Sequence, residues 1–254
     1  MQKLCFLLLV LLPAFQLFAN KQPAPTDILK LPQGQQSFNL SPHLKIYEDS
    51  TASLSLEQVR QSPHLFSKNK KEIPNYSGYR GAVWATFSFI PAETGHIWLE
   101  FADSNIQHIQ LYVYNKQGQL LKQWENGFIF PYYERELKTN LFFVKLEVTE
   151  GETCQAFVRF QTDRQMKLQA RLATLEQIVE DNHRRDVVQG IYFGFVLVMI
   201  LYNLFVFISV RDVAYLYYVA FVACIGFFIG NWNGYAAEFF WPGHYWFNKY
   251  ATSI

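Results

Sequence analysis

The chain has 254 residues, a formal net charge of +1, and a composition in which 50% of the residues are hydrophobic and 18% are aromatic. This length allows a domain with a sizeable core and further elements beside it. The near-zero net charge argues against a nucleic-acid-binding protein, which normally shows a strongly basic face. Of the three cysteines, only Cys154 lies between the two apolar ends of the chain, which excludes an intramolecular disulfide and a cysteine-based metal site there.

The amino terminus has the pattern of a secretory signal peptide over residues 1–19. Lys3 precedes an apolar run that is too short to span a membrane as a helix, and the small residue Ala19 precedes the expected cleavage position. Leu17 fits the cleavage pattern poorly, so an uncleaved membrane anchor stays open as an alternative. In either case the following chain is exported, and residues 20–36 are expected to form a linker.

The region 37–173 is expected to form an exported β-sandwich domain. Apolar and polar residues alternate with a period of two in six segments, and polar turn clusters such as 115–118 and 149–152 lie between segments. Half-buried strands of this kind predict an all-β fold of two antiparallel sheets, and the jelly roll is the expected version. The six segments are 83–89, 97–101, 109–113, 142–148, 156–160 and 166–172.

Two helices are predicted at the borders of this domain. In the segment 51–61, Ser55 stands three residues before Gln58, which matches a helix capping box. The segment 174–186 has apolar residues at helical spacing among many charged ones. We expect this second helix to run without interruption from the domain into the membrane.

The carboxyl-terminal part predicts two antiparallel membrane helices, at 187–209 and 213–230. The first run carries no charge and would measure about 34 Å as a helix, which is enough to cross a bilayer. The exported domain places the connecting turn at Arg211 and Asp212 in the cytoplasm. Residues 231–254 are rich in Trp and Tyr and are expected to form an outer loop and the start of a further element.

Two faces of the first membrane helix carry residues suited to helix packing. Gly190 and Gly194 share one face and have the small-xxx-small spacing that permits close helix approach. Asn203, beside Tyr202, lies on roughly the opposite face and needs a hydrogen-bond partner. Together the two faces predict a helix inside a bundle of more than two helices. The alternatives are that the glycine spacing arises by chance and that water or lipid headgroups satisfy the amide.

Several segments resemble a known family of bacterial membrane receptors. YEDSTASLSLEQV (47–59), the strand with Trp84, the segment 127–135 and FVRFQT (157–162) resemble the type 2 extracellular domain of bacterial seven-transmembrane receptors with diverse intracellular signalling modules. GIYFGFVLVMILYNLFVFISVRDVAYLYYVAF (190–221) looks like the first two helices and the first inner loop of their seven-helix unit. The resemblance extends from about residue 37 to the end of the sequence.

The resemblance implies a sensory receptor of the bacterial inner membrane, and a homodimer is one state open to it. Such receptors carry a periplasmic jelly-roll domain thought to bind a carbohydrate-like or other small ligand, seven membrane helices, and a cytoplasmic output such as a histidine kinase or a diguanylate cyclase. The output module and about five helices are absent from this sequence, which would make it a fragment or a truncated gene product. Thr86 stands where relatives often have a basic residue, which weakens the transfer of a ligand contact to that position.

Six residues are candidates for contacting the ligand, because aromatic rings stack on sugar rings and arginines bind carboxylates or hydroxyls. We expect them on the strand face opposite the core or in a neighbouring loop. The strand residues are Trp84, Trp98, Tyr112 and Arg159, and the loop residues are Trp124 and Arg135. The alternative for the aromatic residues is that they cover a second sheet or lie under a loop. For Arg135, which stands between two glutamates, the alternative is a solvated ion pair.

The sequence favours a binding protein over an enzyme. It contains no G-x-S-x-G, H-E-x-x-H, Walker or C-x-x-C motif, and no metal or cofactor site is predicted. An acidic pair at glycosidase spacing stays open, because a sequence does not give separations in space. We therefore expect the input portion of a receptor, in which a ligand on the β domain shifts the helix 174–186 and with it the first membrane helix. The alternative is a membrane-anchored adhesion or assembly module without signalling.

Overall fold

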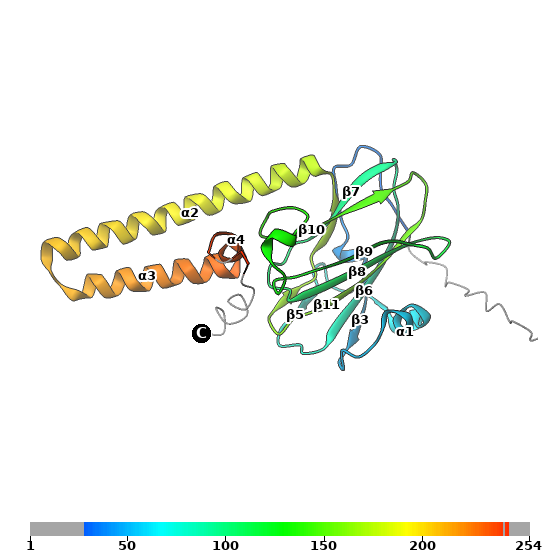
Figure 1. The fold of residues 1–254 in the computed structure, drawn as a ribbon, viewed down its shortest axis with the longest axis horizontal. Helices are drawn as coiled ribbons and strands as arrows, with labels where there is room; N and C mark the ends of the chain where they lie inside the picture. The colour runs from blue at the N-terminus through cyan, green and yellow to red at the C-terminus, as the bar shows by residue number, and fades with distance from the viewer. Residues whose placement is uncertain (1–27, 241, 244–254) are drawn as a thin grey trace, which may run out of the picture.

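The computed structural model describes residues 28–240 and 242–243 (Figure 1). The predicted signal peptide over 1–19 and the first part of the predicted linker lie outside the described residues. The described chain forms a β domain followed by a long helical hairpin that projects from it.

The β domain consists of two main sheets and one small one. The larger sheet has the order β4 (Ser67–Lys68), β3 (Lys45–Asp49), β6 (Ala82–Ile90), β11 (Cys154–Gln161), β8 (His108–Asn115) and β9 (Leu120–Asn126), all antiparallel. The smaller sheet has the order β10 (Phe142–Val148), β7 (Gly95–Phe101), β13 (Ala170–Ala173) and β2 (Ser37–Asn39). A third pair joins β12 (Met166–Lys167) to β5 (Asn75–Tyr76).

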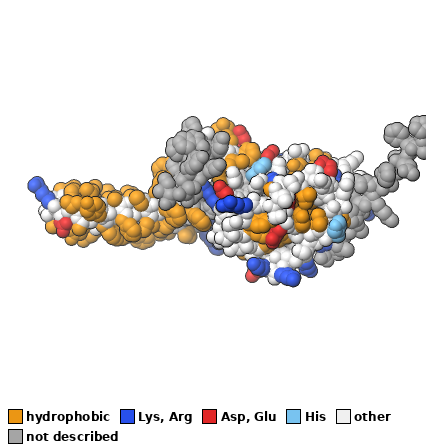
Figure 2. Space-filling view, turned by 90° about the horizontal axis from the view of Figure 1, so that it is seen from below, with side chains coloured by type: hydrophobic (Ala, Val, Ile, Leu, Met, Phe, Trp, Pro, Cys, Tyr) orange, Lys and Arg blue, Asp and Glu red, His pale blue; other side chains and the backbone are white. Residues whose placement is uncertain are grey.

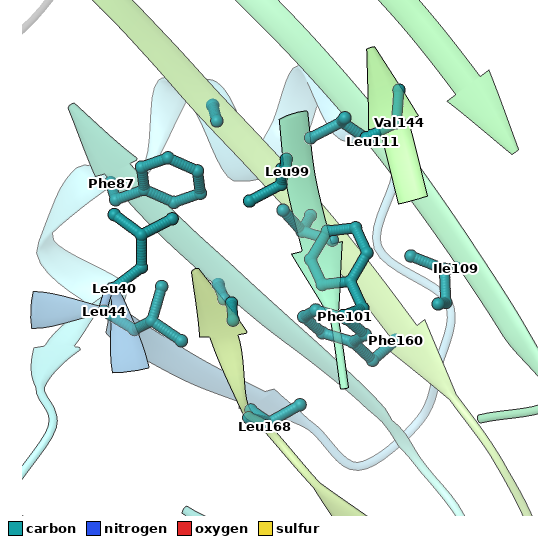
Figure 3. Close-up of a cluster of buried hydrophobic side chains, with 14 of the residues drawn as sticks. Leu40, Leu44, Phe87, Leu99, Phe101, Ile109, Leu111, Val144, Phe160 and Leu168 are labelled. Carbon is teal, nitrogen blue, oxygen red and sulfur yellow. The ribbon is translucent and has the colours of Figure 1, made fainter. Parts of the chain in front are cut away.

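These strand orders confirm the predicted jelly-roll sandwich. The strand β2, near the start of the domain, pairs with β13 at its end, and the order β6-β11-β8-β9 lies opposite β10-β7-β13-β2. The inward residues of both sheets form one core, part of which is shown in Figure 3. Its fully buried side chains include Leu40, Leu44, Leu99, Phe101, Ile109, Leu111, Phe142 and Phe160. These are mostly the apolar positions of the period-two pattern, so alternation correctly predicted which strand face is buried.

Two details of the strand prediction are corrected. The segment 166–172 does not form one strand, because β12 pairs with β5 whereas β13 pairs with β7 and β2. The predicted linker is also wrong for its described part, because β1 (Ile28–Lys30) pairs in parallel with β6, and Leu29 packs against the core. The chain therefore joins the sandwich before residue 37.

The short helix α1 (Leu56–Gln61) lies beside the larger sheet and begins with the predicted capping box. The backbone N–H of Gln58 donates to Ser55 Oγ at 3.4 Å, and the backbone N–H of Ser55 donates to Gln58 Oε1 at 2.8 Å. Short 3-10 helices occur at Ser41–His43, Pro63–Leu65 and Tyr132–Glu134.

The helical hairpin consists of α2 (Leu175–Val210) and α3 (Val213–Trp232), followed by the short helix α4 (Tyr235–Phe239). Arg211 ends α2 in a left-handed conformation with φ +60°, and Asp212 caps α3 by accepting a hydrogen bond from the backbone N–H of Ala214 at 2.9 Å. Both long helices are long and apolar enough to cross a membrane. Figure 2 shows hydrophobic side chains covering this hairpin, in contrast to the mixed surface of the sandwich.

Candidate functional site

Three of the six predicted ligand residues lie together on the outer face of the larger sheet. Arg159 on β11 is in register with Trp84 on β6 and with Gln110 on β8. Its guanidinium donates to the backbone oxygen of Ala52 at 3.1 Å and to Gln110 Oε1 at 3.4 Å. Tyr112 stands two residues after Gln110, so it points to the same face, and it is half-buried.

The helix α1 covers one end of this face. Val59 of α1 packs with Trp84, Tyr114 and Phe157 in a cluster of its own. Trp84 is only 1% exposed, so its ring is not accessible to a ligand, and the prediction of a ligand contact at Trp84 is wrong for this conformation. The alternative account, an outward aromatic residue lying under another segment, holds for it.

The uncovered part of the same face is polar. Glu125 on β9 accepts a hydrogen bond from Gln110 Nε2 at 3.4 Å and contacts the ring of His108. Arg159 and Tyr112 continue this row of hydrogen-bonding groups. Burial lowers the pKa of Arg159 and raises the pKa of Tyr112, and the guanidinium remains a cation while the phenol remains neutral at physiological pH. We call these five residues, from His108 to Glu125 across the strands, the outer polar row.

Trp124 does not belong to a binding surface. It lies in β9 rather than in a loop and points inward, opposite Leu111. Its ring stacks on Phe101 at 6.2 Å between ring centroids and is 8% exposed. The prediction that Trp124 contacts a ligand is therefore wrong, because strand β9 presents it to the core between Gln123 and Glu125.

Arg135 is also buried, and it forms no solvated ion pair. It is 4% exposed, its guanidinium lies 4.7 Å from the centre of the Phe142 ring, and Nη1 donates to the backbone oxygen of Thr139 at 2.6 Å. Burial lowers the pKa of Arg135 to about 10, although Tyr132 and Glu238 nearby favour its charged form. Arg135 thus organises the loop before β10 instead of facing an open groove, so both accounts given for it from the sequence are wrong.

Trp98 lies beneath α2, on the outer face of the smaller sheet. It forms a second cluster with Leu141, Phe143, Ala173 and Ile178, and Ile178 is completely buried although it belongs to α2. Trp98 therefore contacts the helix that leads into the membrane and not a ligand. We call this surface of the smaller sheet, with Trp98, Glu100 and Arg171, the helix-docking face.

A buried charge network joins α2 to the helix-docking face. Glu100 on β7 is completely buried, and it pairs with Arg171 on β13 and, at 3.0 Å, with Arg185 of α2. Arg171 pairs in turn with Asp181 of α2. A buried carboxylate requires such partners, because removing it from water without them costs several kcal/mol. The network fixes both the position and the rotation of the first turns of α2 on the sandwich.

This charge network was not predicted from the sequence, although a signal for it was present. Glu100 and Arg171 occupy outward positions of predicted strands, and Ile178, Asp181 and Arg185 fall on one face of the predicted helix. An apolar residue flanked by opposite charges at helical spacing indicates a helix that packs on a charged surface. The sequence pattern does not show that β13 pairs with β7, and this pairing brings Arg171 next to Glu100.

The sandwich makes a second contact with the outer end of α3. Ser104 Oγ donates to the backbone oxygen of Trp232 at 3.0 Å, and Asn140 Nδ2 donates to the backbone oxygen of Asn233 at 2.9 Å. Gly234 lies between these loops with φ +82°, and a Cβ there would stand 2.8 Å from Ser104 Cβ and 2.9 Å from the backbone oxygen of Asn140. This position therefore requires glycine for its conformation and for its close approach.

The predicted packing residues of α2 have different surroundings. Asn203 Nδ2 donates to the backbone oxygen of Met199 at 2.8 Å within its own helix, and Tyr202 is 66% exposed. Among the described residues, no atom lies within 4 Å of a Cβ built on Gly190 or Gly194, so close packing there stays a prediction.

The hairpin instead packs through two glycines of α3 that the sequence analysis did not single out. A Cβ on Gly226 would stand 3.0 Å from Val196, and one on Gly230 would stand 3.1 Å from Phe193. The small-xxx-small spacing that brings these helices together is thus on α3.

Comparison with protein families assigns both parts of the chain. Residues 41–174 match the family described as 7TMR-DISM extracellular 2, and residues 185–254 match the family described as 7TM diverse intracellular signalling. The chain belongs to the seven-transmembrane receptors with diverse intracellular signalling modules. It is thus the input portion of a membrane sensory receptor of this family, with an extracellular β-sandwich followed by residues of the transmembrane unit. The resemblance stated from the sequence is confirmed.

Curated proteins and solved structures add little to the family assignment. No curated protein matches the receptor sequence. Among solved structures, a β-glucuronidase of Ruminococcus gnavus is 12% identical with a TM-score of 0.30, covering 57% of this chain and 29% of that one. A GH2 β-galacturonidase of Eisenbergiella tayi bound to galacturonate is 14% identical with a TM-score of 0.32, covering 55% and 24%. The receptor chain spans less than a third of the length of these enzymes.

Proposed function

We propose that the β-sandwich binds a small, carbohydrate-like ligand and that its occupancy is passed to the membrane unit through α2. The observation that carries this proposal is the attachment of α2, which is one continuous helix of 36 residues whose first turns are fixed to the sandwich by Ile178 and by the pairs of Glu100. A continuous helix attached at one end transfers a shift of the sandwich to its other end. We further propose that the receptor lies in a bacterial inner membrane with the sandwich in the periplasm.

The outer polar row supports a ligand of this class. Arg159 and Glu125 offer charged hydrogen-bonding groups, Gln110 offers an amide, and Tyr112 offers an aromatic ring beside them. Sugars and sugar acids are recognised by such a combination of planar hydrogen-bonding groups and a ring. We propose binding without catalysis for this chain.

Binding is tested on the full chain in lipid nanodiscs, by thermal unfolding against neutral sugars, oligosaccharides and sugar acids. A ligand that binds the folded state raises the unfolding midpoint, by an amount that grows with its concentration. Arg159→Ala should abolish the shift, whereas Arg80→Ala, an exposed arginine outside the row, should preserve it. A shift that survives Arg159→Ala would place the ligand elsewhere, and no shift with any compound would favour the anchored adhesion or assembly module.

Transmission is tested by measuring a distance across the receptor with and without the ligand. Spin labels at Glu150→Cys and Val210→Cys report the sandwich and the far end of α2, in a background with Cys5→Ser and Cys224→Ser. Cys154 is buried, and burial raises the pKa of its thiol to about 11, so it reacts slowly with the label. We expect the ligand to change the distance, and three glycines inserted after Asp186 to remove that change. A ligand that binds without changing the distance would contradict transmission through α2.

A further inference from the structure

A cleft of about 500 Å³ lies where the sandwich meets the two membrane helices. One wall is formed by the sandwich segments 102–105, 140–141 and 165–169. The other wall comes from α2, at residues 184–189, and from the end of α3 at 232–235. We call it the junction cleft. It lies between the helix-docking face and the contact at Gly234, and no step of the proposed ligand sensing uses it.

The junction cleft opens at the level of the membrane surface. Arg184 and Arg185 are the last basic residues of α2 before the uncharged stretch that begins at Val187. Trp232, which ends α3, lines the same cleft, and tryptophan is typical of the interface between bilayer and water. Groups bound in the cleft would therefore lie at the depth of phospholipid headgroups.

The charge of the cleft is predominantly positive. Lys167, Arg184 and Arg185 line it, of which Arg185 is paired with Glu100, and Asp103 is the one carboxylate among the described residues that line it. Both Asp103 oxygens are already occupied, because one accepts the backbone N–H of Asn105 at 2.9 Å and the other that of Lys167 at 2.7 Å. Lys167 and Arg184 are exposed, and neither forms a direct ion pair with another described residue, although the charge of Lys167 acts on the Asp103 carboxyl.

One hydrogen-bond donor in the wall of the cleft has no acceptor. The amide nitrogen Nε2 of Gln189 is buried without a partner among the described residues. The backbone oxygen of Trp232 already accepts from Ser104, and that of Asn233 accepts from Asn140. A buried donor without an acceptor costs about 1–3 kcal/mol, so the cleft lacks a group rich in acceptor oxygens.

An apolar groove of about 700 Å³ continues from the cleft between α2 and α3. The two share Gln189 and Tyr235, and the groove then runs along Phe193, Gly226 and Phe227. Asp186 and Glu238 also line the groove, and Asp186 accepts a hydrogen bond from the Tyr235 hydroxyl at 3.1 Å. A basic, donor-rich cleft joined to an apolar groove matches one amphipathic molecule, with an anionic head and hydrocarbon chains.

We propose that the junction cleft binds the phosphate of an anionic phospholipid whose acyl chains lie in the groove between α2 and α3. Phosphate supplies the acceptors that Gln189 lacks and the negative charge that Lys167 and Arg184 complement. A lipid held there joins the sandwich, α2 and α3 at one point. Lipid composition then becomes an input that acts independently of a ligand on the outer polar row.

Lipid retention by the full chain is measured by native mass spectrometry, after release from nanodiscs of phosphatidylcholine with phosphatidylglycerol. We expect the chain to retain phosphatidylglycerol selectively over phosphatidylcholine. In the double variant Lys167→Gln with Arg184→Gln, this selectivity should fall at least about tenfold, since each basic residue near an anionic surface contributes about 1 kcal/mol. The matched control is Lys70→Gln with Lys71→Gln, which removes the same charge from exposed positions outside the cleft. Equal retention of both lipids, or equal loss in both double variants, would overturn the proposal.

A second arm separates a lipid from a soluble phosphate compound. Glycerol 3-phosphate is added to the chain in phosphatidylcholine nanodiscs, and the unfolding midpoint is followed. No shift at millimolar concentration is expected, because the groove contributes to binding only through acyl chains. A midpoint shift that disappears in Lys167→Gln with Arg184→Gln, without selectivity for phosphatidylglycerol, would overturn the lipid assignment and give the cleft to a soluble phosphate ligand.

Discussion

At the scale of single residues, the direction of a side chain from its strand decided between binding and structure. Trp84 and Trp124 looked alike in sequence, since both are tryptophans in a predicted ligand group. In the receptor one lies beneath α1 and the other in the core between the sheets. Arg159 alone among the arginines of that group remains on a partly open surface. The covered and the open side chains differ in whether a segment distant in sequence packs over them. A single sequence does not show that packing.

Trp124→Ala is expected to destabilise the sandwich by about 3–5 kcal/mol, because it removes a large ring stacked in the core and leaves a cavity. Gln123→Ala, at the exposed neighbouring position on β9, should change the free energy of unfolding by less than about 0.5 kcal/mol. Urea unfolding of the two variants, followed by near-UV circular dichroism, measures both. Similar stabilities would contradict the core position of Trp124.

Glu100→Ala is expected to cost about 3 kcal/mol of stability, because it leaves Arg171 and Arg185 close together without their shared carboxylate. This cost is at the lower end of that for a fully buried ion pair, because solvent screens the side chains of Arg171 and Arg185, which are 20% and 36% exposed. The control is Glu180→Ala, an exposed carboxylate on α2. Hydrogen exchange of residues 175–186 checks the result: faster exchange in Glu100→Ala alone is expected, and unchanged exchange would show that the network does not hold α2.

At the scale of elements, local patterns predicted most of the fold. Alternation located the strands of the sandwich, the Ser55 and Gln58 pair located the start of α1, and uncharged runs located the membrane parts of α2 and α3. The errors were non-local. The strand β1 was read as a linker because three residues carry no periodicity, and the split of β12 from β13 depends on which strand each one meets.

Helix packing in the hairpin shows the same limit. The glycine pair of α2 was visible in the sequence, but Gly226 and Gly230 of α3 make the close contacts. Gly226→Val is expected to destabilise the hairpin by about 1–3 kcal/mol, because its side chain would overlap Val196. A Cβ built on Gly194 meets no atom of the described residues within 4 Å, so Gly194→Val should be tolerated within this chain. Titration of helical circular dichroism with SDS compares the two, and equal losses would contradict packing through α3.

At the scale of the whole molecule, the sandwich is attached to the membrane unit at two places. The helix-docking face holds α2, and the loops with Ser104 and Asn140 hold the outer end of α3. The family match and the apolar hairpin show that these two contacts join an extracellular domain to membrane helices. A movement of the sandwich relative to one attachment must be taken up at the other.

Gly234→Ala is expected to release the second attachment. Alanine at φ +82° is strained by about 1 kcal/mol, and its Cβ would also collide with Ser104 and Asn140. Gly78→Ala carries comparable backbone strain at φ +68° but has open space around it. Hydrogen exchange of residues 132–140 should rise in Gly234→Ala and not in Gly78→Ala. An equal rise in both variants would mean that backbone strain alone, and not the contact, accounts for the effect.

The continuity of α2 has a geometric consequence. Each residue of an α-helix turns the chain by about 100°, so one alanine inserted after Asp186 rotates the whole membrane part of α2 against the sandwich, and Phe193 and Val196 turn away from the glycines of α3 with it. Seven inserted residues make nearly two full turns and restore the original orientation at a greater length. Ligand-dependent changes at Val210 should therefore vary periodically with the number of inserted residues. The spacing between Arg185 and Val210 sets an angle as well as a distance.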